Sequence, residues 1–325
     1  MPIQATSSYR VNFYFRNKHL NTVHSHLFRK IQDVTYERTR IDTPDGDFLD
    51  IDLSSVGSDN LVLVVHGLEG SADSDYVKGM VRAMNRAGWD ALAINMRSCS
   101  GEPNRLFSSY HSGRSEDIDT IIKYVLGFER YKSISLVGFS LGGNIILKYV
   151  GEKSADISEY IKSAVAISVP CDLRSSSIHL SKNSNKVYYE RLIRSLKKKA
   201  LLKKQLFPDA PYSAKDVQKV KTFHDFDNIY TAPAHEFKDA NDYYAKCSSK
   251  QFLSAITCPT LLINALDDPF FPDACYPFEE AKGNSNFYFE TPKYGGHVGF
   301  NHSLIPRQEF WHETRAVAFL RAATS

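Results

Sequence analysis

The sequence predicts an α/β fold, in which a mostly parallel central sheet carries helices on both faces. The first observation is a set of unbroken apolar runs, such as residues 61–65, which are typical of strands buried on both sides. The second is that these runs alternate with segments of helical periodicity, such as residues 118–126. This alternation favours a parallel sheet, and 325 residues are enough for one large domain with an insertion.

The first half of the chain supplies most of the expected elements. Residues 1–33 have few organising signals beyond scattered apolar side chains, and we expect them to pack as an arm against the domain. A hairpin is predicted from residues 34–43 and 48–53, because the turn sequence Pro44-Asp45-Gly46-Asp47 separates them. Strands are then expected at 61–65, 91–96, 134–137 and 164–169, and helices at 76–84, 118–126 and 145–150.

The regular alternation stops after Pro170. Residues 174–253 are polar, basic and rich in aromatic side chains, and an interval of this length between two strands is too long for a loop. We therefore expect a helical lid insertion at 174–253. It divides an α/β core whose first part is 1–173, with the arm and the hairpin, and whose second part is 254–325. The second part is expected to hold strands at 260–266 and 286–291 and a terminal helix at 307–322.

The composition excludes several classes of function. A net charge of +3 is too small to favour nucleic acid as a partner. The five cysteines are scattered and form no Cys-x-x-Cys pair, so we expect neither a disulfide framework nor a zinc site, and no metal or other cofactor. No apolar run is long enough to span a bilayer, and the first residues lack the apolar core of a signal peptide. These features predict a cytoplasmic protein.

Ser140 is the candidate nucleophile. It stands in Gly138-Phe139-Ser140-Leu141-Gly142, between a short apolar strand and a segment of helical spacing. A Gly-x-Ser-x-Gly sequence between strand and helix is typical of a nucleophile elbow, which exposes the serine hydroxyl at a strained turn. The order of strand, turn and helix makes the motif specific, since the glycines and serine alone recur by chance.

A serine hydroxyl needs a base and a group that orients the base. His297 follows the strand expected at 286–291, in a loop whose glycines allow the imidazole to approach the serine. Asp267 and Asp268 directly follow the strand expected at 260–266, at the same edge of the sheet. Either carboxylate could reach His297; we favour Asp268, and expect the other to bond loop amides. His179, His224, His235, His302 and His312 are expected to be structural or exposed.

Two backbone amides are candidates for the oxyanion hole, which stabilises negative charge on a reacting carbonyl oxygen. Leu141 directly follows the serine at the start of a helix. Leu68 lies in His66-Gly67-Leu68-Glu69-Gly70, after the strand at 61–65, where flanking glycines let the backbone turn. The sequence therefore predicts that the N–H groups of Leu68 and Leu141 face the substrate.

With these motifs the sequence resembles the YheT-like carboxylesterases, a family of the α/β-hydrolase superfamily. The resemblance implies an α/β-hydrolase fold, a catalytic triad of Ser140, Asp268 and His297, and hydrolysis of short- to medium-chain acyl esters or acylglycerols. The family usually has a glycine where this chain has Ser98, and another within the motif that reads His235-Glu236-Phe237 here. The matching segments are His19-Leu20-Asn21-Thr22, Asp45-Gly46-Asp47-Phe48, 66–70, Tyr110-His111-Ser112-Gly113, 138–143, 264–269 and 295–300.

The leading hypothesis is thus a serine hydrolase that acts on a small-molecule ester through an acyl-serine intermediate. Two alternatives use the same fold: an acyltransferase in which an alcohol replaces water, and a ligand-binding protein without catalysis. Within the insertion, residues 189–200 combine an apolar stripe with Arg191, Arg194, Lys197 and Lys198 on the other faces. This basic lid helix is a candidate for peripheral contact with an anionic membrane.

Overall fold

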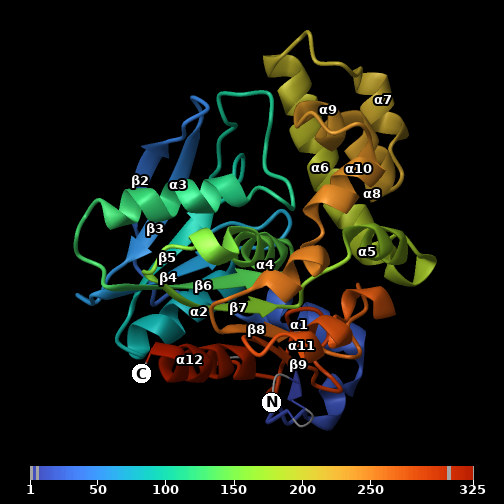
Figure 1. Cartoon of the computed structure of the whole chain (residues 1–325). Helices are drawn as coiled ribbons and strands as arrows, with labels where there is room; N and C mark the ends of the chain where they lie inside the picture. The colour runs from blue at the N-terminus through green and yellow to red at the C-terminus, as the bar shows by residue number, and fades with distance from the viewer. Residues whose placement is uncertain (1–2, 5–6, 306–308, 325) are drawn as a thin grey trace.

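The computed structural model describes residues 3–4, 7–305 and 309–324. Within them, nine strands form one sheet in the order β1-β9-β8-β7-β6-β4-β5-β3-β2 (Figure 1). In this order, each pair of neighbours from β1 through β9, β8, β7, β6 and β4 to β5 is parallel, whereas β3 is antiparallel to both β5 and β2. This arrangement confirms the predicted mostly parallel sheet. The strands are β1 (Ile3–Gln4), β2 (Glu37–Asp42), β3 (Phe48–Ser54), β4 (Asn60–Val65), β5 (Asp90–Asn95), β6 (Ser133–Phe139), β7 (Ile161–Ile167), β8 (Thr260–Ile263) and β9 (Phe287–Glu290).

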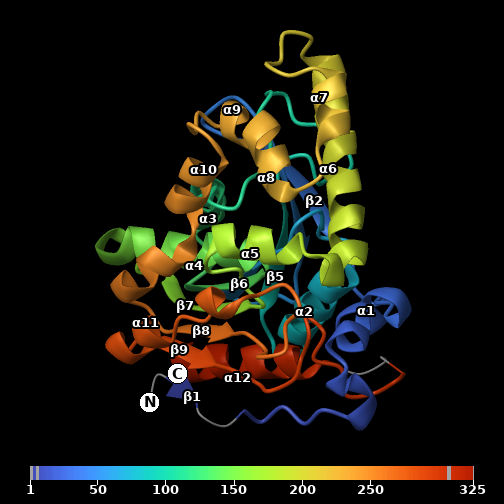
Figure 2. The same cartoon turned by 90° about the vertical axis from the view of Figure 1, so that its right-hand side faces the viewer.

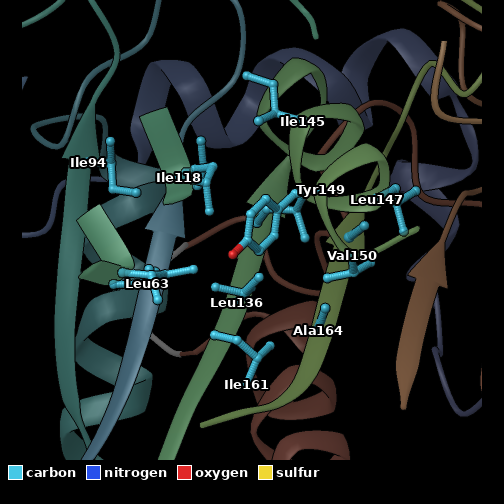
Figure 3. Packing of buried hydrophobic residues seen from close by; sticks show 14 of the residues in the cluster. Leu63, Ile94, Ile118, Leu136, Ile145, Leu147, Tyr149, Val150, Ile161 and Ala164 are labelled. Atoms are coloured by element: carbon cyan, nitrogen blue, oxygen red, sulfur yellow. The ribbon is translucent and has the colours of Figure 1, made fainter. Parts of the chain in front are cut away.

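Helices cover both faces of this sheet. Alternate residues of β4 separate the two layers: Leu63 packs in the cluster formed with α3 and α4, whereas Val62 and Val64 pack in the cluster formed with α2 and α12. Figure 3 shows the first of these clusters, with Leu63 and Leu136 of the sheet beneath side chains of α3 and α4. The helices are α2 (Asp75–Arg86), α3 (Ser115–Leu126), α4 (Leu141–Lys153), α11 (Phe278–Gly283) and α12 (Trp311–Thr324).

A group of helices stands between β7 and β8, in the interval where the sequence predicts an insertion. In Figure 2 these helices rise from the carboxyl end of the sheet, and α6 is the longest of them. They have a core of their own, in which Ile193, Leu196 and Ala200 of α6 pack against Phe223 and Phe226. The helices are α5 (Leu173–Leu180), α6 (Lys186–Leu206), α7 (Ala214–Lys219), α8 (Phe223–Phe226), α9 (Ala232–Ala234) and α10 (Ala240–Cys247).

The N-terminal arm is more regular than the sequence suggests. It contains a short 3₁₀ helix, η1 (Phe13–Arg16), and a helix α1 (Lys18–Phe28). The side chain of Asn17 caps α1 by accepting the backbone N–H groups of His19 and Leu20. Strand β1 adds to the outer edge of the sheet beside β9. The arm therefore packs against the domain, as expected, and also extends its sheet.

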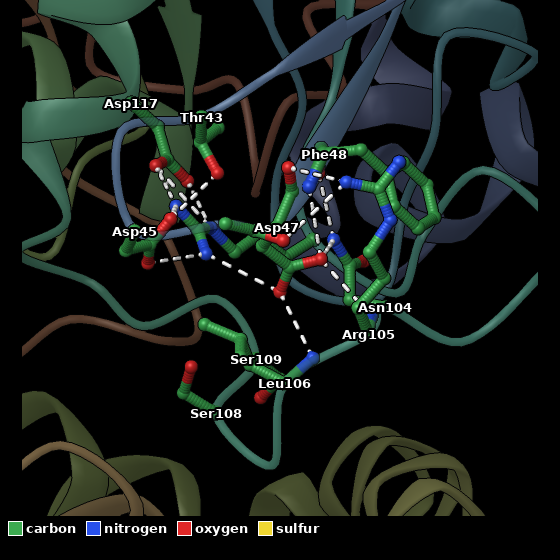
Figure 4. A network of polar contacts seen from close by, with 12 residues as sticks. Thr43, Asp45, Asp47, Phe48, Asn104, Arg105, Leu106, Ser108, Ser109 and Asp117 are labelled. Carbon is green, nitrogen blue, oxygen red and sulfur yellow. Dashed lines mark hydrogen bonds and ion pairs between the residues drawn. The ribbon is translucent and has the colours of Figure 1, made fainter.

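A buried polar network fixes the loop that follows β5. Arg97 forms ion pairs with Asp45, Asp47 and Asp117, which come from the hairpin turn and from α3. Asn104 in the same loop donates to Asp47 and to the carbonyl of Phe48 at 2.8 and 2.7 Å (Figure 4). Moving the loop would separate these partners and leave a buried charge unpaired, which costs free energy. The network therefore holds the loop after β5 in one position.

Several predicted boundaries shift. Strand β7 starts three residues before the expected Ala164, and β8 ends at Ile263 rather than at Leu266, because the chain turns toward the carboxylates there. The prediction of a terminal helix from residue 307 falls partly on 306–308, which lie outside the described residues. Among the helices that the structure describes, none is long and apolar enough to cross a membrane.

Candidate active site

Ser140 lies at the turn between β6 and α4. Its backbone has φ 50° and ψ −117°, a strained combination for a residue with a side chain. The turn is tight: a Cβ on Gly138 would come within 2.6 Å of the carbonyl oxygen of Gly142, and a Cβ on Gly142 within 2.3 Å of that of His66. The two glycines of the motif are therefore required by close backbone approach.

His297 connects Ser140 to Asp268. Its Nε2 lies 3.0 Å from Ser140 Oγ, and its Nδ1 lies 2.9 Å from Asp268 Oδ2. The Asp268 side chain is fully buried, and its other oxygen accepts the backbone N–H of Phe270 at 2.8 Å. A neutral imidazole with its proton on Nδ1 satisfies both contacts, donating to the carboxylate and accepting from the serine hydroxyl. The structure thus joins Ser140, His297 and Asp268, the three residues predicted from the sequence, by two consecutive hydrogen bonds.

Asp267, the neighbour that the sequence left open, faces elsewhere. Its Oδ1 accepts the N–H of Gly296 at 2.9 Å, and its Oδ2 is buried without a hydrogen-bond partner. Burial, together with the nearby charge of Asp268, raises the pKa of Asp267 to about 6. The carboxyl that bonds a loop amide is therefore Asp267, and the carboxyl on the imidazole is Asp268.

This raised pKa predicts a pH-dependent stability. The folded protein holds the Asp267 proton more tightly than the unfolded chain, so the contribution of this group is present below about pH 4 and is lost as the pH rises through about 6. Asp267→Asn cannot ionise. Its free energy of unfolding relative to the wild type should therefore improve by about 2 to 3 kcal/mol between about pH 4 and about pH 7. Urea unfolding across this range measures the difference; parallel pH profiles would contradict it.

The loop that carries His297 is held by two hydroxyls that the sequence analysis did not assign. Thr22 Oγ1 of α1 accepts the N–H of His297 at 3.0 Å, and Ser168 Oγ accepts the N–H of Val298 at 2.9 Å. A Cβ on Gly296, which has φ 57°, would lie 2.7 Å from Thr22 Oγ1. The sequence could have pointed to Thr22, because this residue ends His19-Leu20-Asn21-Thr22, one of the segments that match the YheT-like family.

The loop after β4 lies against Ser140. A Cβ on Gly67 would be 3.2 Å from Ser140 Cβ, and the Gly67 N–H donates to the hydroxyl of Tyr76 at 2.9 Å. His66 is fully buried: its Nδ1 contacts the Gly67 carbonyl and its Nε2 accepts the N–H of Met96. Burial lowers the pKa of His66 to about 4, so this histidine is neutral and structural.

Leu68 and Leu141 lie on the two segments that border Ser140. Leu141 begins α4 directly after the serine, and Leu68 follows Gly67 in the adjacent loop. Among the hydrogen bonds found in the described residues, none uses the N–H of either leucine. Both amides are therefore available to a bound group, at a place where the start of α4 adds a favourable dipole for negative charge.

Glu69 ties this loop to the insertion. Its backbone has φ 56°, and its buried carboxylate accepts from the hydroxyl of Tyr110 at 2.7 Å. Lys199 of α6 forms an ion pair with the same oxygen at 2.8 Å, and Ser195 of α6 donates to the other oxygen. We name Glu69, Tyr110, Ser195 and Lys199 the Glu69 cluster. It joins the helix α6 to the residue that follows Leu68.

A cavity of about 610 Å³ opens over Ser140 and His297. The imidazole is stacked on the ring of Phe270, with centroids 4.0 Å apart. The insertion supplies much of the remaining wall, which is mainly apolar near α5, α6 and α8. Cavities of this size accept small organic ligands. In the part of the chain that the structure describes, no three side chains of His, Cys, Asp or Glu gather in a way that could hold a metal ion. The apolar residues of the wall include Leu180, Leu192, Leu196, Phe223 and Phe226.

Comparisons with known proteins show the family to which the fold belongs. Residues 60–302 match the family described as the alpha/beta hydrolase fold. The YheT protein of Escherichia coli (strain K12) is 35% identical over 93% of this chain and 89% of its own length. Phospholipase ABHD3 of Bos taurus is 27% identical over 89% of this chain and 72% of its length.

A solved structure shares the fold at lower identity. The Pyrococcus furiosus esterase Pf2001 superposes with a TM-score of 0.62 at 17% identity, over 90% of this chain and 92% of that chain. Its likeness concerns the arrangement of sheet and helices. Taken with the family match over residues 60–302 and the similarity to YheT, it leads to one conclusion: the chain belongs to the α/β-hydrolase fold family and, within it, to the YheT-like group.

Proposed function

We propose that the protein is a serine hydrolase that cleaves carboxylic esters through an acyl-serine intermediate. The observation that carries the proposal is the pair of hydrogen bonds that joins Ser140 to His297 and His297 to Asp268, with Ser140 and His297 lining the cavity. Membership of the α/β-hydrolase family and the similarity to a phospholipase support ester chemistry.

The proposed reaction assigns one role to each residue. Ser140 Oγ attacks the ester carbonyl while His297 Nε2 takes its proton, and Asp268 holds the imidazole and stabilises its charged form. His297 then returns the proton to the leaving alcohol. Water, activated by the same imidazole, attacks the acyl-serine and releases the acid. The N–H groups of Leu68 and Leu141 stabilise the negative oxygen of each tetrahedral intermediate.

The cavity indicates the substrate class within this proposal. An apolar wall from α5, α6 and α8 suits the acyl chain of a short- to medium-chain ester or an acylglycerol. The insertion, residues 174–253 in the proposed domain division, is proposed to act as a lid, because its side chains line much of the cavity that Ser140 also lines. Burial of an acyl chain there contributes favourable free energy in proportion to the apolar area removed from water.

A series of p-nitrophenyl esters with increasing acyl length tests the proposal. The wild-type protein should hydrolyse the butyrate and related esters, and kcat/KM should rise with acyl length until the chain fills the cavity. Release of one acid for each nitrophenol identifies water as the acceptor. Absence of turnover with every member of the series would contradict ester hydrolysis, and acyl transfer to an added alcohol in place of acid would indicate an acyltransferase.

The Glu69 cluster predicts a separate effect on turnover. Replacing Lys199 with Met removes the cation that holds the carboxylate of Glu69, so the loop that carries Leu68 loses its fixed position. We expect kcat to fall by about 10- to 100-fold with little change in KM, because the Leu68 N–H acts on the transition state. Steady-state kinetics measure both constants. The matched control is Lys198→Met, an exposed neighbour on α6, which should behave as wild type. Equal loss in both variants would contradict the role of the cluster.

A further inference from the structure

The arm before β2 exposes large apolar side chains to solvent. Phe13, Leu27 and Phe28 are 65%, 59% and 63% exposed, and Tyr14 and Leu20 are also exposed. Two further exposed residues, Leu304 and Ile305, lie in the loop that continues from Asn301, which bonds Asn21 of α1. Scattered apolar residues are common on protein surfaces, but a group of this kind on one short segment marks an interaction site.

This arm forms one wall of the cavity. Residues Thr22, Val23, Ser25 and His26 of α1 line the cavity, and Val23 neighbours the exposed Leu20 and Leu27 on the helix surface, three and four positions away. The first turns of α6 line it next to them: His19 Nδ1 lies 3.1 Å from the hydroxyl of Tyr188. Figure 2 shows α1 directly below the lower end of α6. The exposed apolar side chains therefore lie beside the part of the cavity that α1 and α6 share, and Val187, 80% exposed, adds to them from α6.

The charge on these two segments is mainly positive, and the acidic residue in the first half of α6, Glu190, is paired with Lys186 at 3.7 Å. The first acidic residue of the chain is Asp33, whereas Arg10, Arg16 and Lys18 precede it, all exposed and without an ion pair to any described residue. Arg191 and Arg194 are exposed on α6 in the same way. Arg29 and Lys30 are excluded from this set, because Glu313 and Asp75 neutralise them.

We propose that the arm of residues 10–28, together with the first half of α6, docks on an anionic lipid bilayer with the shared side of the cavity facing it. Aromatic and aliphatic side chains enter the headgroup region while the basic side chains attract the anionic lipids, as in other peripheral membrane proteins. The basic helix predicted from the sequence thus supplies half of the surface, and the arm supplies the apolar half. Lys197 does not take part, since it donates to the carbonyl of Gln218 within the insertion.

The docking itself is independent of the proposed function; only its use, delivery of a lipid-like ester from the bilayer to Ser140, rests on that function. The test uses the full chain with Ser140→Ala, so that no lipid is consumed, and measures co-sedimentation with two kinds of vesicle. One is phosphatidylcholine alone, and the other contains about 30 mol% phosphatidylglycerol. Binding should be at least about tenfold stronger to the anionic vesicles and should weaken as salt is added.

Three variants assign the binding to this surface. Leu27→Ser with Phe28→Ser, and separately Arg16→Glu with Lys18→Glu, should each reduce the partition coefficient by about tenfold or more. The matched control is Phe128→Ser, which removes an aromatic side chain of similar exposure, 54%, after α3. Each variant should keep the wild-type melting temperature. When Ser140 is intact, each should also hydrolyse a water-soluble ester at the wild-type rate, because the substituted residues lie outside the cavity lining.

The outcomes separate the two proposals. Vesicle binding that is lost in both double variants and kept in Phe128→Ser supports the surface, even if the wild type hydrolyses no ester. Equal binding by all variants, or no preference for anionic vesicles, overturns it. The alternative partner for this surface is a second copy of the chain, and light scattering tests for it. If the protein bound no vesicles but formed a dimer that Leu27→Ser with Phe28→Ser dissociated, the surface would be a self-association interface and the proposal would be overturned.

Discussion

Ser140→Ala should lower kcat for p-nitrophenyl butyrate by about 10⁶-fold, to the background rate of hydrolysis. The reason is that alanine removes the only atom that can form the acyl-enzyme, and the remaining amides and imidazole cannot act on an attacking water held at a different position. The residue sits at φ 50°, which alanine tolerates as poorly as serine, so the stability of the fold should change little.

Thermal unfolding of Ser140→Ala provides the control. A melting temperature close to that of the wild type, combined with loss of turnover, assigns the effect to chemistry. Retention of more than a small fraction of the wild-type rate by a folded Ser140→Ala protein would exclude this serine as the nucleophile.

Asp268→Asn should lower kcat by about 10⁴-fold. An amide at this position can present its NH₂ group to His297 Nδ1, which favours the proton on Nε2, where it cannot accept the hydrogen of Ser140. The change is nearly isosteric, so the buried side chain keeps its volume and its bond to the Phe270 N–H. Steady-state kinetics at several pH values measure the loss, which should persist when the pH is raised.

Asp267→Asn is the matched comparison. Its amide oxygen can still accept the N–H of Gly296, and the residue does not contact His297, so kcat should stay within a few-fold of the wild type. The same variant should show the stability profile described above. If Asp267→Asn were the inactive variant and Asp268→Asn the active one, the assignment of the two carboxylates would be reversed.

The sheet and the positions of Ser140, Asp268 and His297 could be predicted because both depend on short sequence patterns. Parallel strands buried on both faces are continuous apolar runs, and β4 and β6 are found where the runs are. Ser140, Asp268 and His297 each follow a strand that ends at the same edge of the sheet, so a sequence that orders the strands also brings these side chains near one another.

The choice between the two carboxylates depended on tertiary structure. Both residues follow β8, and the sequence offered only the position of Asp268 before Pro269 as a reason to prefer it. The structure separates them through their partners, because the loop presents Gly296 to one carboxylate and the imidazole to the other. Such a distinction arises from the path of a distant loop, which no local pattern specifies.

Helix α1 was not predicted, although Leu20, Val23, Leu27 and Phe28 have helical spacing, because the expectation for residues 1–33 did not use this spacing. The apolar stripe also does not face a core, since Leu20, Leu27 and Phe28 are exposed. What stabilises it is tertiary contact: Asn21 is buried and bonds Asn301, and Thr22 bonds the loop of His297. The arm thus has its structure because of the site loop on which it packs.

The two departures from the YheT-like pattern gain a physical meaning in the structure. Ser98 stands where the resemblance leads us to expect a glycine, and Glu236 lies within the motif 235–237 where it leads us to expect another; both residues have positive φ values, 62° and 59°. Residues other than glycine are strained in this region, which explains why glycine suits these positions. Ser98 is held by its N–H bond to Asn104, in the loop that Arg97 fixes.

The cavity wall was predicted only in outline. Aromatic residues of the insertion were expected to serve either as pocket lining or as the core of the insertion, and Phe223, Phe226 and Tyr230 belong to both, since each is buried and each borders the cavity. The Glu69 cluster had no sequence signal, because it joins Lys199 to a glutamate 130 positions earlier through packing of α6 on the sheet edge.

Covalent labelling tests the central claim most directly. A fluorophosphonate reacts with a serine that is activated by a neighbouring base and leaves a stable phosphonyl group on its oxygen. After reaction of the wild-type protein, peptide mass spectrometry should place one phosphonyl group on Ser140, and hydrolysis of p-nitrophenyl butyrate should be lost in proportion to the labelled fraction. Full hydrolytic activity after Ser140 is completely labelled, or labelling at another serine that abolishes activity, would contradict the account.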